Sequence, residues 1–409
     1  MINIGLLGLG TVGIGVVQTI NEKRKDLEQL TNKRINISKI LVKDIEKKRE
    51  IRIDRNILTT DAADIIGDKD INIVIEVMGG LETAYSHIEE ALKEGKHVIT
   101  ANKAVVAKYL EELTILARQV NRAFLYEASV GGGIPIIKPL EDQININDIH
   151  EIKGILNGTS NYILTRMISE NIELQEALGI SQELGYAEAD PTDDIEGYDT
   201  RRKLRILSTI GFRNKIDEGE ISCMGISSIK AIDIENIKDM NCTVKLLGEA
   251  NIKDNKYYAS VEPVILDKNS YFGKVEDANN LVSFIGDRVG ELRFFGEGAG
   301  RFPTSNAILS NLIDITTNDY EKKLLPRNNS LHNINGLYEG KYYLRVTVKK
   351  DIEAKIEKYI NDKEIAERVV KDDNNIGFIT KVVAKGELER LIEFFDLEKE
   401  NYFIAKMRV

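Results

Sequence analysis

"INIGLLGLGTVGIGVVQTI" occupies residues 2–20 of the 409-residue chain. The first residues, INIGLL, have the length and β-branched content of a buried strand. After the last glycine of GLGTVG, the apolar residues recur with the spacing of a helix. Within GLGTVG, Gly8 permits a tight turn, Gly10 permits a ligand to approach the backbone, and Gly13 permits close packing of helix on strand. The stretch therefore predicts a strand, a glycine turn and a helix that begin a parallel α/β sheet.

Short runs rich in β-branched residues recur through the first third of the chain, and helical patterns separate several of them. Strands that alternate with helices favour a doubly wound parallel sheet with right-handed crossovers, which is a Rossmann-like fold. The predicted strands are Ile2–Leu7, Ile35–Val42, Ile71–Val77, Lys96–Thr100 and Ala123–Glu127, with helices over Glu82–Glu94 and Ala104–Gln119.

The pattern changes near His150, where predicted helices over Thr159–Ser169, Gln175–Leu184 and Thr200–Ile210 are followed by long sheet-like segments without helices between them. We interpret this part as an α+β domain for substrate binding and dimerisation, and expect the helix over residues 300–320 to complete the N-terminal fold. The end of the chain has the ferredoxin-like order of strand, helix, strand, strand, helix, strand. The predicted domains are residues 1–133, 134–320 and 341–409, with a linker over 321–340.

The composition excludes several classes of partner. A formal net charge of -10 argues against a nucleic-acid partner, because phosphate binding relies on clustered Lys and Arg. No apolar stretch is long enough to span a bilayer and no signal peptide is present, so no membrane partner is expected. Cys223 and Cys242 have no metal-ligand spacing and form no disulfide framework, which indicates a reducing cytoplasm. A small polar substrate fits best.

The GLGTVG turn favours a dinucleotide, whose pyrophosphate would lie at the helix N-terminus. A purely structural glycine turn has the same letters, although the position directly after the first strand favours a cofactor. NAD-binding folds usually place an acidic residue at the end of the second strand, whereas Lys43 precedes Asp44 here. Because a cation suits a 2'-phosphate, NADP(H) is expected to be preferred over NAD(H). A solvated lysine at a strand end would show the same pattern.

Three further segments could face a ligand, and the first lies at the edge where an α/β sheet binds ligands. Lys103 follows the strand that ends at Thr100, either as a ligand-facing lysine or as an ordinary surface lysine. Gly131 to Gly133 expose backbone groups to a ligand or cation, or simply connect two domains. "NGTSNYILT", residues 157–165, offers a polar helix N-terminus that caps only itself or faces an anion.

"EADPTDDIEGYDTRRK", residues 188–203, concentrates carboxylates ahead of three cations. A solvated loop and a surface ion pair are the ordinary interpretations. If a helix begins at "DTRRK", Asp199 and Lys203 lie on one helical face, and Asp199 can converge with Glu188 and Asp194 to hold an ammonium group. Lys203 could then carry the proton that accompanies hydride transfer. The other carboxylates expected to face water are Asp190 and Glu196.

Together these segments resemble homoserine dehydrogenase. The resemblance covers nearly all of the first 320 residues and rests on "GLGTVG", "TANKAVVA", "YEASVGGGIPII", "ILNGTSNYILT", "LGYAEADPTDDIEGYDTRRK" and "GEGAGRFPTSNAILSNL", in this order. It implies reversible NAD(P)-dependent interconversion of L-homoserine and L-aspartate 4-semialdehyde, a step towards threonine and methionine.

The resemblance also implies roles for individual residues. Lys203 matches the acid/base lysine, and Lys103 matches a lysine between cofactor and substrate, so either is a candidate for moving the proton. The residues expected to bind homoserine are Glu188, Asp194 and Asp199. The expected cofactor contacts, from the glycine motif and the resemblance, are Gly8, Gly10, Thr11, Val12, Gly13, Lys43, Thr100, Lys103, Gly185 and Gly300. A monovalent cation such as Na+ is expected at Glu127 and the carbonyls of Val130, Gly132 and Ile134. Asn306 departs from the small residue expected there.

The resemblance further implies a monofunctional enzyme without an aspartate kinase domain, assembled as a homodimer or larger homo-oligomer. The last residues, 341–409, resemble an ACT domain that lacks the usual Asp-x-Pro-Gly turn between "YYLRVTV" and the following helix. That turn contributes glycine and helix amides to an amino-acid pocket. We therefore expect a degenerate ACT-like domain and weak inhibition by threonine.

Two alternatives stay open from the sequence. Sugar-type dehydrogenases share the nucleotide fold and a "GKHV" strand, but usually carry Glu-Lys-Pro where this chain has Ala-Asn-Lys. A sensor protein that kept the fold and lost turnover would also match, although the intact lysines and carboxylates argue against it.

Overall fold

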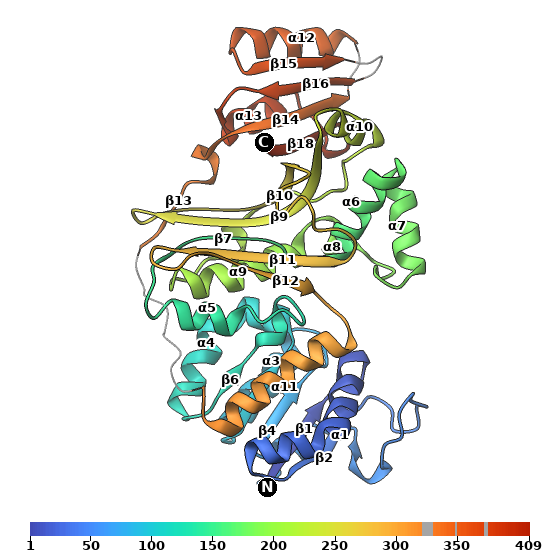
Figure 1. Cartoon of the computed structure of the whole chain (residues 1–409), viewed down its shortest axis with the longest axis vertical. Coiled ribbons are helices and arrows are strands. Elements are labelled where there is room, and N and C mark those ends of the chain that lie inside the picture. The colour runs from blue at the N-terminus through green and yellow to red at the C-terminus, as the bar shows by residue number, and fades with distance from the viewer. Residues whose placement is uncertain (321–329, 348–349, 372–374) are drawn as a thin grey trace. The chain divides into compact units, whose positions relative to one another are not determined.

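The chain folds into two compact units, each assembled from separate stretches of sequence (Figure 1). The computed structural model describes residues 1–320, 330–347, 350–371 and 375–409. The N-terminal unit comprises Met1–Ile149, Arg205–Lys215 and Gly286–Asn328. The second unit comprises His150–Leu204, Ile216–Ile285 and Asn329–Val409.

A parallel sheet with the strand order β3-β2-β1-β4-β5-β6 forms the centre of the N-terminal unit. The order reverses between β1 and β4, as in Rossmann folds, so the predicted doubly wound sheet is confirmed. The elements are β1 (Ile2–Leu7), α1 (Thr11–Thr31), β2 (Ile35–Leu41), β3 (Leu58–Thr59), α2 (Ala63–Ile66), β4 (Ile73–Glu76), α3 (Glu82–Lys93), β5 (His97–Thr100), α4 (Lys103–Gln119), β6 (Phe124–Leu125), α5 (Ile137–Gln143), β12 (Gly290–Glu297) and α11 (Arg301–Thr317).

Steric constraints explain the glycines of the first turn. Gly8 has a φ of +107°, and a Cβ there would lie 2.8 Å from the carbonyl oxygen of Val77. A Cβ at Gly13 would collide with the carbonyl oxygen of Gly8, so α1 can begin this close to the turn only without a side chain. A Cβ at Gly10 would meet no atom within 4 Å. Gly8 and Gly13 thus serve the fold, whereas Gly10 leaves room for a ligand.

Helix α11 belongs to the core of the N-terminal unit although it is distant in sequence. Ile308 of α11 shares a hydrophobic cluster with Ile4 and Ile75 of the sheet. Gly15 of α1 lies against the backbone of Arg301, where a Cβ would be 2.7 Å from the carbonyl oxygen. The helical pattern predicts α11 locally, and the fold packs it beside α1.

Asparagines define several helix ends in both units. Asn102 caps α4 by accepting a hydrogen bond from the amide of Val105 at 3.3 Å, and Asn157 caps α6 by accepting one from Ser160 at 2.7 Å. Asparagine also adopts the left-handed conformation that ends a helix at little cost. The C-caps of α1, α6 and α11 are Asn32, Asn171 and Asn318, with φ of 51, 57 and 61°.

A long mixed sheet runs through the second unit in the order β11-β7-β9-β10-β18-β14-β16-β15. Its elements are β7 (Ile149–Ile155), α6 (Gly158–Glu170), α7 (Leu174–Glu183), α8 (Thr192–Ile195), α9 (Tyr198–Gly211), β8 (Ser222–Cys223), α10 (Ala231–Asp239), β9 (Cys242–Lys253), β10 (Lys256–Asp267), β11 (Asn279–Gly286), β13 (His332–Asn333), β14 (Glu339–Thr347), α12 (Lys350–Asp362), β15 (Ala366–Lys371), β16 (Asn375–Thr380), β17 (Val383–Ala384), α13 (Lys385–Phe394) and β18 (Tyr402–Arg408). The helices predicted near residues 159, 175 and 200 correspond to α6, α7 and α9, whereas α8 and α10 were not predicted.

The tail, defined here as residues 341–409, has the predicted ferredoxin-like element order. Side chains alternate along β14, so that Tyr342 and Leu344 pack in the cluster formed with α12 and α13. Tyr343 and Arg345 project to the opposite face and hydrogen-bond to Asp233 of α10. Elements of the unit therefore cover both faces of the tail's sheet.

The tail continues the sheet formed by β9 and β10 without a break. β18 pairs in parallel with β10, with Val264 opposite Lys406 and Leu266 opposite Arg408. The compact units therefore group the tail with β9 and β10, and the domain boundaries predicted from the sequence stay predictions. Residues 321–329 of the predicted linker, and residues 348–349 at the altered ACT turn, lie outside the described residues.

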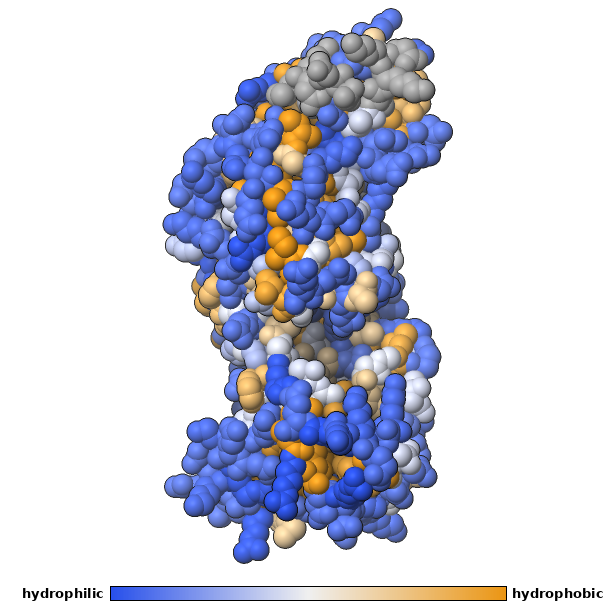
Figure 2. All heavy atoms as spheres, turned by 90° about the vertical axis from the view of Figure 1, so that its right-hand side faces the viewer, coloured by the Kyte–Doolittle hydropathy of each residue, from blue (hydrophilic) through white to orange (hydrophobic). Residues whose placement is uncertain are grey.

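The exterior is largely polar. Charged and other hydrophilic side chains cover most of the face drawn in Figure 2, as expected for a chain in which 30% of residues are charged. Among the described helices, none combines the length and apolar character that a membrane crossing requires.

A buried ion pair anchors β14 to α10. The guanidinium Nε of Arg345 donates to Asp233 at 2.8 Å, and both side chains are at most 1% exposed. Burial raises the pKa of Asp233, while Arg345 and hydrogen bonds from Lys230 and Tyr343 oppose that rise. The carboxylate of Asp233 can therefore be buried only because its ion pair and hydrogen bonds offset the cost of removing it from water.

Arg345→Met is expected to lower the free energy of unfolding by about 3–5 kcal/mol, because it leaves the carboxylate of Asp233 buried without its cation. Urea denaturation followed by circular dichroism measures the change. Lys341→Met is the matched control, because Lys341 lies on the same strand but its pair with Glu367 is exposed. The control should cost at most about 1 kcal/mol. Equal losses in the two variants would contradict the buried-pair account.

Candidate active site

The carboxyl ends of β1, β4 and β5 form the edge at which a Rossmann sheet binds its ligand. Glu76 ends β4, is fully buried, and accepts hydrogen bonds from the hydroxyl of Thr100 at 2.6 Å and the amide of Met78 at 2.8 Å. Burial raises the pKa of Glu76, and these hydrogen bonds oppose the rise. The side chain of Thr100, which is 0% exposed, thus stabilises the buried carboxylate of Glu76 at this edge of the sheet.

Lys103 is the first residue of α4 and is held at the same edge. Its neighbour Asn102 caps the helix and donates from Nδ2 to the carbonyl oxygen of Gly80 at 2.7 Å. Lys43 follows β2 at that edge and is exposed. The fold therefore brings the predicted cofactor residues of β1, β2 and β5 to one side of the N-terminal unit, with Thr11 and Val12 in the first turn of α1.

A second glycine cluster joins distant segments of the N-terminal unit. A Cβ on Gly132 would lie 2.5 Å from the carbonyl carbon of Gly298, and the amide of Gly133 donates to the carbonyl oxygen of Glu297 at 3.2 Å. Gly300 follows with a φ of +124° and caps α11. The segments GGG (residues 131–133) and GEGAG (residues 296–300) thus pack against each other, although they are far apart in sequence.

Glu127 serves the start of α5. Its carboxylate accepts hydrogen bonds from the amides of Ile136, Ile137 and Lys138 at 2.7–2.8 Å, and the side chain is buried. Burial raises the pKa of Glu127, and the backbone hydrogen bonds oppose the rise. Three amide donors occupy much of the capacity of this carboxylate, so a cation at the predicted site would depend mainly on backbone carbonyls.

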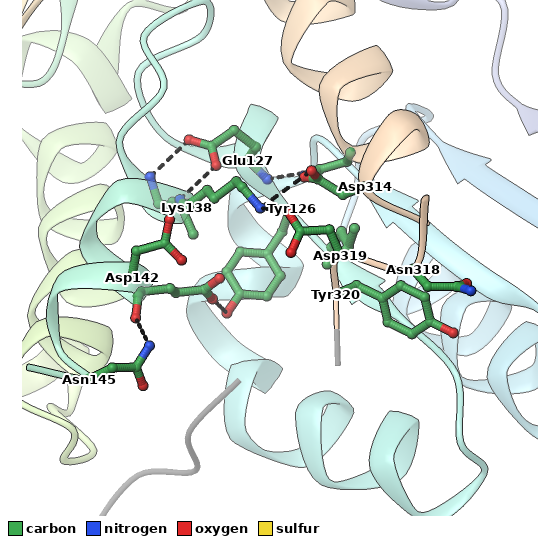
Figure 3. Close-up of a pocket in the computed structure, with 13 residues that line it drawn as sticks. Tyr126, Glu127, Lys138, Asp142, Asn145, Asp314, Asn318, Asp319 and Tyr320 are labelled. Carbon is green, nitrogen blue, oxygen red and sulfur yellow. Dashed lines mark hydrogen bonds and ion pairs between the residues drawn. The ribbon is translucent and has the colours of Figure 1, made fainter. Parts of the chain in front are cut away.

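A pocket of about 180 Å³ lies on another side of Glu127 (Figure 3). Lys138 crosses it towards Asp319 and Asp314, at 2.7 and 3.4 Å from their carboxylates. The carbonyl contributors of the predicted cation site, Val130, Gly132 and Ile134, are not among the residues that line this pocket. The pocket and the predicted cation site therefore share Glu127 but not the backbone carbonyls of the site.

In the second unit, Lys203 and Asp199 form a buried ion pair one turn apart on α9. The ammonium Nζ lies 2.7 Å from Asp199 and donates to the carbonyl oxygen of Leu156 at 2.7 Å. The side chains are 10% and 1% exposed, respectively. Surface ion pairs remain solvated, so this burial removes the surface-pair interpretation that the sequence left open.

Asn157 connects two of the predicted substrate residues, and sequence reasoning did not identify this role. Its Nδ2 donates to Asp194 at 2.7 Å and to Asp199 at 2.9 Å, while its Oδ1 caps α6. An asparagine that caps a helix and bridges two carboxylates needs both ends of its amide. The segment "NGTSN" signalled only the cap, because the carboxylates come from residues 37 and 42 positions away.

The remaining residues of the acidic segment divide into two groups. Glu188 and Gly185 are exposed, and Asp190 faces water as predicted while accepting hydrogen bonds from Thr192. The prediction that Glu196 faces water is wrong: its side chain is 18% exposed and forms an ion pair with Lys399 of the tail. The long-range partner explains the difference, because Lys399 is 203 residues away.

Comparison with known proteins decides the family. The sequence pattern of homoserine dehydrogenase matches residues 135–313, and that of the homoserine dehydrogenase NAD-binding domain matches residues 8–127. A homoserine dehydrogenase of Bacillus subtilis is 42% identical over 317 residues, which cover 78% of this chain and 73% of that relative. The chain belongs to the homoserine dehydrogenase family.

Solved structures agree with this family. A homoserine dehydrogenase from Thiobacillus denitrificans has a TM-score of 0.88 and 31% identity, covering 100% of this chain and 98% of that chain. A hyperthermophilic archaeal homoserine dehydrogenase in complex with NADPH has a TM-score of 0.66 and 25% identity, covering 79% of this chain and 99% of that chain. Homoserine dehydrogenases are NAD(P)-dependent oxidoreductases, so the predicted family and enzyme class are confirmed and the sugar-type and sensor alternatives fall away.

Asn157→Ser tests whether the bridge supports a homoserine dehydrogenase site. Serine preserves the cap of α6 but does not reach both aspartates, so the buried carboxylate of Asp199 loses a hydrogen bond. The free energy of unfolding should therefore fall by about 1–3 kcal/mol, and the KM for homoserine should rise roughly three- to tenfold. Initial rates over a homoserine series, together with thermal unfolding, measure both effects. A large loss of stability with an unchanged KM would mean that Asn157 serves the fold alone.

Proposed function

We propose that this chain catalyses the reversible interconversion of L-homoserine and L-aspartate 4-semialdehyde with NADP(H), a step towards threonine and methionine. The observation that supports it most directly is the cluster in which the buried Asn157, Asp199 and Lys203 meet the half-buried Asp194. A buried lysine among carboxylates provides both an ammonium-binding surface and a proton carrier. The direct test adds aspartate semialdehyde and follows the absorbance of NADPH and of NADH separately.

Lys203 is proposed as the acid/base residue. When bound, the nicotinamide supplies or accepts the hydride. In the reducing direction the ammonium of Lys203 donates a proton to the aldehyde oxygen, and in the oxidising direction its amine accepts the hydroxyl proton of homoserine. Asp199, 2.7 Å from Nζ, holds Lys203 in place. Lys103 is the second candidate for the proton, because it also lies at the edge where ligands bind.

Substrate binding is proposed for the carboxylates of the acidic segment. Asp199 and Asp194 share the amide of Asn157, which keeps two like charges together at a fixed separation. Glu188 is exposed nearby in sequence and is available to a ligand. Carboxylates are the natural partners of the α-ammonium group that homoserine and aspartate semialdehyde both carry.

A preference for NADP(H) is proposed from Lys43. This lysine is exposed two residues beyond β2, where the ribose of a dinucleotide lies in Rossmann folds. The archaeal relative was solved with NADPH, which fits the same preference. The cofactor contacts proposed with it are Gly8, Gly10, Thr11, Val12, Gly13, Thr100, Lys103, Gly185 and Gly300.

A monovalent cation such as Na+ is proposed at the GGG turn. Gly131 and Gly132 have φ of +75° and +54°, which bends the main chain sharply next to the carbonyls of Val130, Gly132 and Ile134. Carbonyl oxygens suit a hard ion. Glu127 fits this ion only in part, because its carboxylate already accepts three amides.

The assembly and the compartment are also proposed rather than observed. A homodimer or larger homo-oligomer is proposed because the chain belongs to the homoserine dehydrogenase family. A cytoplasmic location is supported by the cysteines, because Cys223 and Cys242 are both free thiols.

Lys203→Ala is expected to lower kcat by roughly 10²- to 10⁴-fold, the usual contribution of a general acid/base, while homoserine binding largely survives. Asp199→Ala should raise the KM, because it removes an ammonium partner present in both ground and transition states, and should also lower kcat, because it removes the carboxylate that holds Lys203. Steady-state kinetics of both variants measure the two effects. Near-normal turnover of the Lys203 variant would transfer the role to Lys103 or to water.

Lys43→Ala is expected to raise the KM for NADPH and to leave the KM for NADH nearly unchanged, because only NADPH carries the 2'-phosphate. Cofactor titrations at saturating aspartate semialdehyde measure both constants. An equal rise for the two cofactors would refute the assignment of Lys43.

A further inference from the structure

The acidic segment that contains Asp194 and Asp199 packs on residues 222–226, and residues 222–226 in turn contact the tail. Residues 195–197 join Asp194 to α9, and their backbone packs closely on the segment after β8. The amide of Ile226 donates to the carbonyl oxygen of Ile195 at 2.7 Å, and the thiol of Cys223 donates to that of Glu196 at 3.3 Å. A Cβ on Gly225 would collide with the Ile195 carbonyl, so no side chain separates the two segments.

The tail contacts residues 222–226 on their other side. Lys385, at the start of α13, is 3% exposed, and its ammonium donates to the hydroxyl of Ser222 at 3.2 Å and to Glu262 at 2.8 Å. Met224 packs against the hydrophobic cluster of the tail. Burial alone would raise the pKa of Glu262. The positive charges of Lys385 and Lys406 outweigh burial and lower this pKa to about 2. The tail and the segment 222–226 therefore form one packed body.

One charged contact joins the tail directly to the acidic segment. Lys399, in the short helix Lys399–Asn401 before β18, pairs with the carboxylate of Glu196. Glu196 is 18% exposed and Lys399 is 52% exposed, so the pair is partly shielded from water. Glu196 lies between Asp194 and Asp199 in sequence, and the two aspartates are joined by Asn157.

We propose that Lys399 is a positioning residue for substrate binding: through Glu196 it holds the segment 194–199 in the geometry that the amino-acid substrate requires. The inference rests on the proposed function of the acidic segment and extends it to the tail. Lys399 itself touches neither Asp194 nor Asp199 but acts through the backbone between them. The ACT-like tail then serves catalysis as a fixed support, whether or not it binds an effector.

The test compares Lys399→Met with Lys341→Met in the full-length protein. Both lysines belong to the tail and pair with a carboxylate, but Glu367, the partner of Lys341, lies within the tail itself, 2.6 Å away. Lys399→Met and Glu196→Gln should each raise the KM for homoserine about two- to fivefold, with kcat and the KM for NADP(H) unchanged. The exchanged pair Lys399→Glu with Glu196→Lys should recover most of the loss, and Lys341→Met should change nothing.

Hydrogen exchange followed by mass spectrometry provides a readout that does not need turnover. Lys399→Met should speed exchange in peptides that cover residues 188–199, and Lys341→Met should not. Identical behaviour of the two lysine variants in KM and exchange would overturn the proposal. Faster exchange with an unchanged homoserine KM would also overturn it, because the segment would then be held without being positioned for substrate. If the unaltered protein does not turn over homoserine, the proposed function fails, and exchange alone still decides whether Lys399 holds the segment.

Discussion

The ion pair of Lys203 and Asp199 constrains how three segments of the second unit come together. Two charges that are almost removed from water are stable only when each finds further hydrogen bonds. Lys203 finds one at the carbonyl oxygen of Leu156, at the end of β7, and Asp199 finds one at the amide of Asn157. The end of β7, the start of α6 and the start of α9 must therefore come together before the pair can be buried. The buried lysine and a helix cap thus depend on the same arrangement.

The same principle recurs where the tail meets the rest of the second unit. Asp233 with Arg345, Glu262 with Lys385, and Glu249 with Lys406 are buried pairs whose members lie far apart in sequence. Such pairs add little net stability over apolar packing, but they penalise any arrangement that leaves one partner alone. They therefore specify how the tail docks on β9, β10 and α10 more strongly than they stabilise it. This specificity suits the proposed role of the tail as a support for the acidic segment.

In the N-terminal unit the controlling constraint is steric. Gly8, Gly13 and Gly15 are needed because a side chain at each would collide with backbone, and Gly10 is the member of the motif with open space around it. The distinction separates residues that build the turn from the residue that leaves room for a pyrophosphate. The open space around Gly10 and its place in GLGTVG both fit the proposed ligand-binding role.

The sequence by itself determined the local elements, the family and most of the proposed site. The parallel α/β start, the ferredoxin-like order of the tail, and the placement of Asp199 and Lys203 one helical turn apart all follow from spacing, because neighbours along a helix or strand are fixed by its geometry. Tertiary structure alone decided which distant groups meet: Asn157 with two aspartates, Glu196 with Lys399, and β18 with β10. The physical reason is that backbone periodicity fixes only the direction and face of each side chain within its own helix or strand. The partner of a buried polar group depends instead on which sheet edges and helix ends the whole chain brings together. That arrangement must also provide a partner for every charge that is removed from water.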